Sequence, residues 1–503
     1  MSSRASTIIS RISSTRSIIK TAPPYDHFSL VAFFCVPVRG LGRFLDDPFP
    51  SPGQGREGRN ALNGKASYSY SIMGTSCVQE VNFRMYLFTG RGVEIPQEKN
   101  SSLQGEIQKL SLSSRLEVPL YTLGRTQLEL TVGVGEPIRK YAPLALSPSR
   151  NHAILSPVSG KLMGVDSRIH PLLGKVPCAL IQADPEGREE KIRPQWETGM
   201  GYDKLERIAR EAGIVDETDH SPLYRKLRTL RQSGINLVIA SALDDDPYVT
   251  SGMAVVREWG EEVVQGLELL DVVCPNAIGL LALYDPGGCA AVKAVPERIR
   301  NTEVLRVTGK YPLWPALEKK WRGQKTARIG VQALRALSRA AFQGEAMADV
   351  VLTVAGNAVR RPRNVQVPVG TPVEHVLKQC GARDVRWVSG GNAMTGYPIE
   401  DIHAPVLPGM RCVLAMSSRP WARAYSCIGC GKCIEACPQK LMPFSIAQLY
   451  ERGEREEAGK YGADRCIGCG ACSAVCPAGI ELSAIMRHAA DRGKRHHEEW
   501  GKA

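Results

Sequence analysis

Eight cysteines toward the end of this 503-residue chain have the type and spacing to hold an inorganic cofactor. They form two runs of one pattern, Cys-x2-Cys-x2-Cys-x3-Cys-Pro, made by Cys427, Cys430, Cys433 and Cys437 and then by Cys466, Cys469, Cys472 and Cys476. Three cysteines at this spacing follow one tight loop, and the fourth lies a turn further on, which is typical of [4Fe–4S] ligands. Zinc, the alternative, usually takes two separated pairs, often with histidine. The runs therefore predict two [4Fe–4S] clusters.

The fourth cysteine of each run is expected to bind the cluster of the other run, as it does in two-cluster folds. One cluster would then take Cys427, Cys430, Cys433 and Cys476, and the other Cys466, Cys469, Cys472 and Cys437. Glycines between the cysteines, such as Gly429 and Gly468, let backbone N–H groups approach the sulfides. Two clusters with crossed ligands lie close together, so they would form a two-step path for electrons between a donor and an acceptor.

The elements around these runs follow from periodicity. Between the runs, Ser445–Tyr461 places Ile446, Leu449 and Tyr450 on one face, which predicts a helix with a charged, solvated outer face. The ferredoxin-type domain is expected over residues 417–483 and a charged tail over 484–503.

The net charge of +13 does not require a polyanionic partner. Residues 1–84 hold ten Lys and Arg against five Asp and Glu, and two clusters with their thiolates would add about −4. No nucleic-acid partner is therefore expected. The longest apolar run is too short for the roughly 20 residues that span a bilayer, so no transmembrane segment is expected. Cysteines grouped as cofactor ligands in a large chain fit a reducing compartment.

Residues 1–84 differ from the rest of the chain. They are rich in Ser, Arg, Gly and Pro and show no lasting periodicity, which predicts a disordered segment or an overextended start with translation beginning at Met85. Residues 85–195 are expected to be short strands with turns, a structural β module. Its clearest pieces are the alternating stretch Leu128–Val134 and the turn around Gly160.

Residues 196–342 mix helical and strand patterns, which predicts an α/β domain. Gly234–Ala240 is a buried strand, and Leu270–Cys274 is expected to be a second one. The first strand leads into Asp244, Asp246 and Tyr248. Acidic residues after a parallel strand lie at the edge of the sheet where ligands bind, so these three are candidates for binding flavin or nucleotide. Helix capping in a solvated loop is the alternative.

Residues 343–416 are rich in strands and form the next expected domain. Val350–Gly356 is a strand that enters a turn, and a second strand after Val365 leads into a helix over Val373–Cys380.

The order of these domains resembles the RnfC family, the C subunits of Rnf electron-transport complexes. Stretches that carry the resemblance are FTGRGVEIPQEK, SPVSGKL, DDDPYVTSG, VLTVAGNAV and VSGGNAMTG, together with the cysteine runs. The resemblance implies a barrel-sandwich module, an α/β domain similar to the flavin- and NADH-binding subunit of complex I, a β-grasp (SLBB-like) domain and a two-cluster ferredoxin domain. Soluble relatives include the electron-transfer protein of D-proline reductase systems.

The chain departs from the family at its nucleotide site. Family members carry a glycine-rich loop of the type GxGGAGFPT, whereas acidic residues follow Gly213-Ile-Val215 here. A second motif, KYPxGG, is here Lys310-Tyr-Pro-Leu-Trp-Pro315, without glycines. Side chains would block the approach of backbone N–H groups to phosphates, and carboxylates would repel them. The sequence thus argues against ordinary FMN and NADH binding and favours the D-proline reductase-associated relatives.

We therefore expect a cytoplasmic iron–sulfur protein that passes electrons through two [4Fe–4S] clusters to a partner reductase of D-proline reductase type. One alternative is an NADH- or flavin-dependent reductase that uses Asp244, Asp246 and Tyr248. The other is a component of an Rnf-type membrane complex, held peripherally at the inner face of the cell membrane, with the α/β domain as a docking scaffold.

Overall fold

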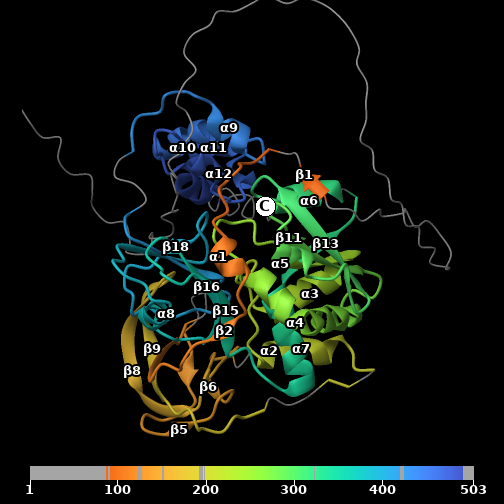
Figure 1. The fold of residues 1–503 in the computed structure, drawn as a ribbon, viewed down its shortest axis with the longest axis vertical. Coiled ribbons are helices and arrows are strands. Elements are labelled where there is room, and N and C mark those ends of the chain that lie inside the picture. Colours follow the sequence, from red (N-terminus) through yellow and green to blue (C-terminus); the bar gives the residue numbers. More distant parts are fainter. Residues whose placement is uncertain are drawn as a thin grey trace, which may run out of the picture.

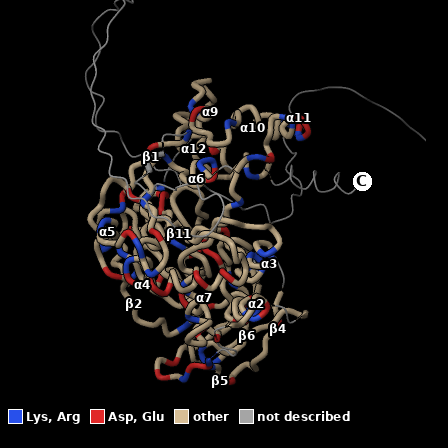
Figure 2. The backbone as a smooth tube through the Cα atoms, turned by 90° about the vertical axis from the view of Figure 1, so that its right-hand side faces the viewer, with Lys and Arg blue, Asp and Glu red and all other residues tan. Residues whose placement is uncertain are grey.

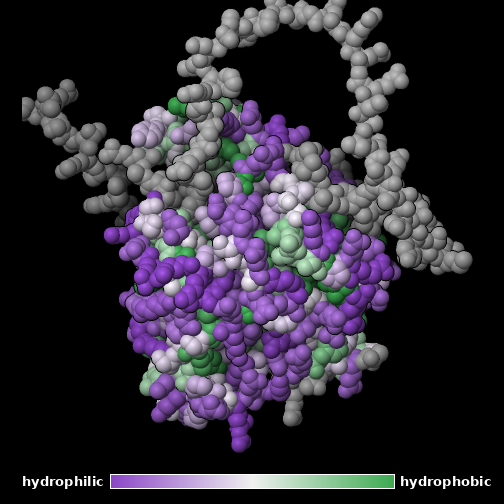
Figure 3. Space-filling model, viewed as in Figure 1, coloured by the Kyte–Doolittle hydropathy of each residue, from purple (hydrophilic) through white to green (hydrophobic). Residues whose placement is uncertain are grey.

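The computed structural model describes residues 86–88, 91–121, 127–149, 152–191, 196–197, 199–321, 323–419 and 424–490. The prediction for residues 1–84 lies outside these ranges, as does most of the charged tail. Within the described ranges, no helix is both long enough and apolar enough to cross a bilayer. The face seen in Figure 3 is largely hydrophilic, with separate hydrophobic areas.

The α/β domain is built on five parallel strands in the order β1-β13-β11-β10-β14, with a short antiparallel strand β12 (Arg298–Ile299) beside β13. The parallel strands are β1 (Tyr86–Phe88), β10 (Leu237–Ala242), β11 (Ile278–Tyr284), β13 (Thr302–Gly309) and β14 (Thr326–Gly330). The helices packed with them are α2 (Tyr202–Glu211), α3 (Leu223–Ser233), α4 (Ser251–Glu268), α5 (Ala290–Lys293), α6 (Trp314–Lys320) and α7 (Val331–Gln343). The predicted α/β domain is confirmed (Figure 1).

One strand of this domain was predicted in the wrong place. Leu270–Cys274 is not a strand, because Leu269–Val272 forms the 3-10 helix η1 that ends α4. The neighbour of β10 is β11, a few residues later. Short apolar runs fit a buried turn of helix as well as a strand, so periodicity could not separate the two.

The β module lies at the end of the molecule opposite the cysteine runs (Figure 1). One sheet has the order β3-β9-β8-β5 and the other β4-β6-β7. The strands are β3 (Arg115–Pro119), β4 (Glu129–Leu130), β5 (Pro137–Ile138), β6 (Pro143–Leu146), β7 (Ala153–Leu155), β8 (Gly160–His170) and β9 (Gly174–Ala183). Leu116, Leu144, Leu162 and Ile181 fill the space between the sheets and are fully buried.

His170 should make this module sensitive to acid. Its Nδ1 accepts the backbone N–H groups of Leu172 at 3.0 Å and Leu173 at 3.2 Å, and burial lowers its pKa to about 4. The folded state therefore binds fewer protons than the unfolded state between pH 4 and 6.5, so stability is lost as the pH falls through this range, by about 3 kcal/mol. Chemical denaturation across this range should show the loss in the wild type and a smaller loss in His170→Asn, which keeps an acceptor. Equal losses in the two proteins would contradict the prediction.

The β-grasp domain is a sheet of order β18-β17-β19-β15-β16-β2 covered by α8 (Val373–Gln379). Its strands are β15 (Asp349–Ala355), β16 (Arg363–Pro368), β17 (Trp387–Gly390), β18 (Tyr397–Pro398), β19 (Cys412–Met416) and the earlier strand β2 (Gln108–Lys109). The predicted strands after Val350 and Val365 and the predicted helix from Val373 are confirmed.

The segment that precedes the β module joins two other domains. β1 pairs with β13, and β2 pairs with β16. Between them, helix α1 (Asn100–Leu103) carries Ser102, whose hydroxyl accepts the hydroxyl of Thr250 at 3.0 Å and whose carbonyl accepts the Asn364 amide at 3.0 Å. This buried network ties the α/β and β-grasp sheets together. The predicted domain boundaries themselves stay predictions.

The cysteine runs lie in a small helical domain, α9 (Lys432–Ala436), α10 (Pro443–Glu451), α11 (Arg455–Lys460), η2 (Ala463–Arg465) and α12 (Ala471–Ala474). The predicted single helix Ser445–Tyr461 is wrong, because Gly453 takes φ 81° and divides it into α10 and α11. The charged residues between the two helices are exposed, as expected. Elsewhere, blue basic and red acidic positions are mixed along the visible side of the chain (Figure 2).

Candidate functional site

The two predicted ligand sets of the eight cysteines contain side chains of different exposure. Cys427 and Cys430 are exposed and Cys433 and Cys476 half-buried; we call these four the outer set. Cys437 and Cys472 are buried and Cys466 and Cys469 half-buried; these four are the inner set. None of the eight forms a disulfide bond. The exposed cysteines thus belong to one predicted set and the buried ones to the other, while each set also holds two half-buried cysteines.

The two runs adopt the same local backbone, which sequence repetition alone predicts. The Gly429 N–H points to Cys427 Sγ and the Gly468 N–H to Cys466 Sγ, each at 3.4 Å. Both glycines are left-handed, with φ 68° and 65°, a conformation that costs glycine little. Each loop can therefore turn back toward its own first sulfur and present N–H groups to it.

Cysteines from the two runs lie near each other in the crossed combination. Burial raises the pKa of Cys472 well above its usual range, and the charges of Cys469, Cys466 and Cys437 add to this rise. Burial also raises the pKa of Cys433, where Cys476 adds its charge. Thiolates so placed repel one another unless cations compensate them, and cluster irons supply such positive charge.

A small hollow opens within the inner set. Its lining includes all four inner cysteines, with Gly468, Gly470 and Ala471 between them. The Leu441 N–H points to Cys437 Sγ at 3.4 Å. Four sulfurs around one hollow, with small residues beside them, fit a [4Fe–4S] cluster.

Within the described residues, no three His, Cys, Asp or Glu side chains are placed to bind a single metal ion. The ligands of a [4Fe–4S] cluster each bind a different iron atom, so they lie further apart than the ligands of one ion. The ligand assignment of the eight cysteines stays a prediction.

The inner set packs against the α/β domain. The Tyr311 hydroxyl, from the loop after β13, donates to the Cys469 carbonyl at 2.7 Å. Tyr311 and Met394 form an apolar contact with Cys469 and Ala474. Burial raises the pKa of Tyr311 well above its usual range, and the charges of Asp246 and Cys469 add to this. Tyr311 thus stands between the inner set and the acidic edge of the sheet.

The acidic candidates after β10 are buried rather than solvated. Asp244, Asp245 and Asp246 are 3%, 8% and 4% exposed. Arg411, just before β19, donates to Asp246 Oδ2 at 2.9 Å and lies 3.6 Å from Asp244 Oδ1. Lys99 Nζ donates to the Asp246 carbonyl. Three segments far apart in the sequence therefore meet in one charged cluster.

Charges within this cluster depend on each other. Burial raises the pKa of Asp245 to about 6, and Asp246 adds to the rise. Burial raises the pKa of Asp244 against the opposing charge of Arg411. Burial lowers the pKa of Lys99 to about 8, although the three carboxylates oppose this. Burial lowers the pKa of Arg411, but the nearby carboxylates raise it by more, so the pKa is higher than usual. Arg411 is therefore the residue of the cluster that stays positively charged.

Tyr248, the third candidate, lies beside this cluster rather than within it. It has φ 68°, its backbone N–H donates to the Gln97 carbonyl at 2.8 Å, and its ring packs near Val249 and Cys412. Burial raises its pKa to about 12.

Three residues of this region were not predicted as site residues. Lys99 ends the stretch FTGRGVEIPQEK, and Tyr311 belongs to the altered KYPxGG motif, whereas Arg411 lies in no motif. Membership in those stretches was the signal that could have drawn attention to Lys99 and Tyr311. Nothing in the residues around Arg411 indicates that it meets the acidic cluster.

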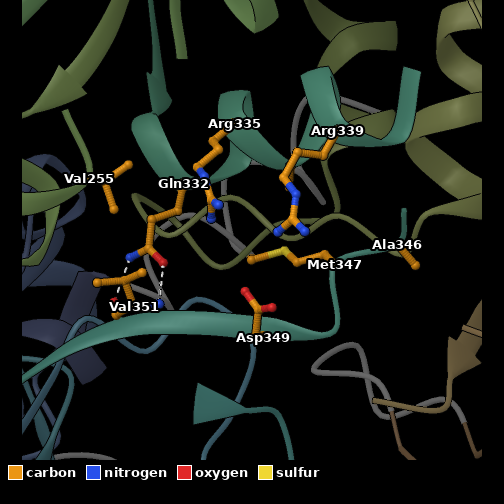
Figure 4. Close-up of a pocket in the computed structure, with 9 residues that line it drawn as sticks. Val255, Gln332, Arg335, Arg339, Ala346, Met347, Asp349 and Val351 are labelled. Atoms are coloured by element: carbon orange, nitrogen blue, oxygen red, sulfur yellow. Dashed lines mark hydrogen bonds between the residues drawn. The ribbon is translucent and has the colours of Figure 1, made fainter. Parts of the chain in front are cut away.

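A second small hollow lies between α7 and β15. Figure 4 shows Arg335 and Arg339 of α7 on one side and Asp349 on the other. Both arginines are already engaged: Arg335 donates to Glu262 at 2.8 Å, and Arg339 pairs with Glu345. The Gln332 side chain bonds the backbone of Val351 in both directions, so this contact joins the two domains.

Family comparisons agree with this organisation. Residues 88–186 match the RnfC barrel sandwich hybrid domain, residues 351–384 the SLBB domain and residues 426–480 the 4Fe-4S dicluster domain. These matches confirm the predicted barrel-sandwich, β-grasp and two-cluster domains. The predicted resemblance to the RnfC family is confirmed, and the chain combines an RnfC barrel sandwich hybrid domain, an SLBB domain and a 4Fe-4S dicluster domain.

Curated relatives share one description, the C subunit of an ion-translocating oxidoreductase complex. The protein from Serratia proteamaculans is 28% identical over 75% of this chain and 57% of its own length. That from Pectobacterium atrosepticum is 29% identical over 75% and 57%, and that from Rhodobacter capsulatus 26% over 74% and 76%. The chain thus spans little more than half the length of the first two.

A solved structure, the NAD+-reducing [NiFe]-hydrogenase in the H2-reduced state, matches with TM-score 0.38 and 14% identity over 58% of this chain and 60% of that chain. A likeness at this level supports no conclusion about function.

Proposed function

We propose that this chain is a peripheral, RnfC-like component of an Rnf-type membrane oxidoreductase and passes electrons through two [4Fe–4S] clusters to a partner at its surface. The observation that carries the proposal is the placement of the two cysteine sets, one against the α/β domain and one at the surface. When bound, [4Fe–4S] clusters accept and release single electrons. The relatives reported above, described as C subunits of ion-translocating oxidoreductase complexes, favour this assignment over a D-proline reductase partner.

The surface around the outer set suits a protein partner. Ile428, between Cys427 and Cys430, is 69% exposed, and Tyr425 is equally exposed. Ile434 adds a third exposed apolar side chain, and Arg91 donates to its carbonyl at 2.9 Å. Apolar side chains with a nearby cation are common at interfaces between proteins. The partner we propose is another redox protein of the complex, which covers the outer set.

The first test is composition. Protein purified without oxygen, or reconstituted with iron and sulfide, should contain about eight irons per chain and give an EPR signal on reduction with dithionite. A colourless preparation with no such signal would refute the proposal.

The second test is the partner contact. Ile428→Asp should weaken co-sedimentation of the full chain with membranes of its native host, since it puts a charge into the apolar contact. Val134→Asp, at a 65% exposed position of the β module, is the matched control and should behave like the wild type. Iron content must stay unchanged in both, and equal sedimentation of the two variants would count against the proposed surface.

A further inference from the structure

The carboxyl edge of a parallel sheet is where such domains bind nucleotides, because the helices that follow the strands point their N-terminal N–H groups at the phosphates. In this chain, the segments that follow β10, β11, β13 and β14 all present N–H groups at that edge. We infer that the chain's own buried carboxyl groups accept hydrogen bonds from these N–H groups in place of a phosphate. The α/β domain therefore binds neither FMN nor NADH.

After β10, the acceptor is Asp244. Its Oδ2 accepts the Met253 N–H, in the first turn of α4, at 2.9 Å. The fit is close: a Cβ at Gly252 would lie 3.0 Å from Asp244 Oδ1. A phosphate could not approach this end of α4 without displacing the carboxylate.

After β14, the acceptors come from the segment that replaces the family's glycine-rich loop. Asp216 Oδ1 accepts the Gly330 N–H at 3.1 Å. Glu217 Oε1 accepts the Gln332 N–H at 2.7 Å, and Oε2 accepts the Ala333 N–H at 3.1 Å. The acidic residues that replace the glycine motif therefore accept the hydrogen bonds of the N–H groups at the start of α7.

The remaining two strands show the same arrangement. After β11, Asp285 Oδ1 accepts the N–H groups of Gly287 at 3.1 Å and Gly288 at 2.6 Å. After β13, Asp245 Oδ2 accepts the Leu313 N–H at 2.7 Å, where α6 begins.

These acceptors are part of the protein interior. Asp216, Asp285 and Glu217 are 0%, 1% and 5% exposed, and the Asp residues after β10 are similarly buried. Displacing a carboxyl group from such a place would leave it without its hydrogen bonds, which costs much more than it would for an exposed group. A bound phosphate would also stand beside buried acids, and like charges repel.

The inference is tested first on the wild-type full chain with its clusters reconstituted. Equilibrium dialysis against FMN, and separately against NADH, should leave neither bound. Retention of one FMN or one NADH per chain would overturn the inference. Iron content and the EPR signal are measured on the same sample, so a failure of this inference is distinguishable from a failure of the proposed function.

A second test asks whether a carboxyl group really stands where an anion would bind. In Glu217→Ala the N–H groups at the start of α7 lose their partner, and inorganic phosphate should raise the melting temperature more than chloride does at equal ionic strength. Asp285→Ala is the second variant should the first not fold. The wild type and Glu261→Ala, at an exposed position of α4, should show only the smaller, general stabilisation that phosphate gives over chloride. An equal phosphate effect in all proteins, or none in either variant, would overturn the inference.

Discussion

Two double cysteine variants should differ in iron content by about four atoms per chain, although each removes two ligands. In Cys437→Ala/Cys472→Ala both losses fall in the inner set, so one cluster survives and about half of the iron remains. In Cys433→Ala/Cys437→Ala the losses fall in different sets, although both cysteines belong to the first run. Both clusters should then be lost.

Ligation within each run predicts the reverse result for the same pair of proteins. The variant with both changes in the first run would then keep about half of the iron, and the variant with changes in both runs would lose all of it. Cys380→Ala serves as the control, since Cys380 is a buried thiol in the β-grasp core and should not alter the iron content. Iron and sulfide analysis of the oxygen-free proteins gives the answer.

The largest loss of stability is expected from Arg411→Ala. This change removes the positively charged guanidinium group from beside Asp244 and Asp246, which are both buried. Breaking a buried ion pair by removing one partner costs about 3–5 kcal/mol, because a charge is left without compensation. Chemical denaturation should show this loss, and hydrogen exchange should locate it at β10 and β19.

Lys378→Ala is the matched comparison for Arg411→Ala. Its ion pair with Glu374 lies on the exposed face of α8, and such a pair is worth about 0–1 kcal/mol. Arg411→Lys keeps the charge and should recover part of the loss. Should Arg411→Ala and Lys378→Ala destabilise the chain equally, the acidic cluster does not depend on Arg411.

The features that could be predicted from the sequence are those that depend on patterns within one short segment. The repeat of cysteines, glycines and proline predicted a two-cluster domain, and the apolar stretches that end at Ala240 and Gly356 predicted strands. Local patterns were insufficient where a single residue decided the outcome. Gly453, in the left-handed region, divided a predicted helix into two.

Long-range contacts could not be read from the sequence. Lys99, Asp246 and Arg411 meet although hundreds of residues separate the first from the last. The acidic residues after Val215 were expected to block and repel phosphate, and one of them, Glu217, also accepts hydrogen bonds from two N–H groups at the start of α7. Both facts depend on how the sheets are placed against each other, and no periodicity within one segment encodes that placement.

The strands β1 and β2 have a consequence for folding during synthesis. They are the first described strands to leave the ribosome, yet their partners β13 and β16 are made more than two hundred residues later. The β module, which follows them directly, can fold as soon as it emerges, while β1 and β2 stay unpaired until their partner strands are made. Slowing translation within the α/β domain should therefore lower the soluble yield of the whole protein, since unpaired strand edges promote aggregation.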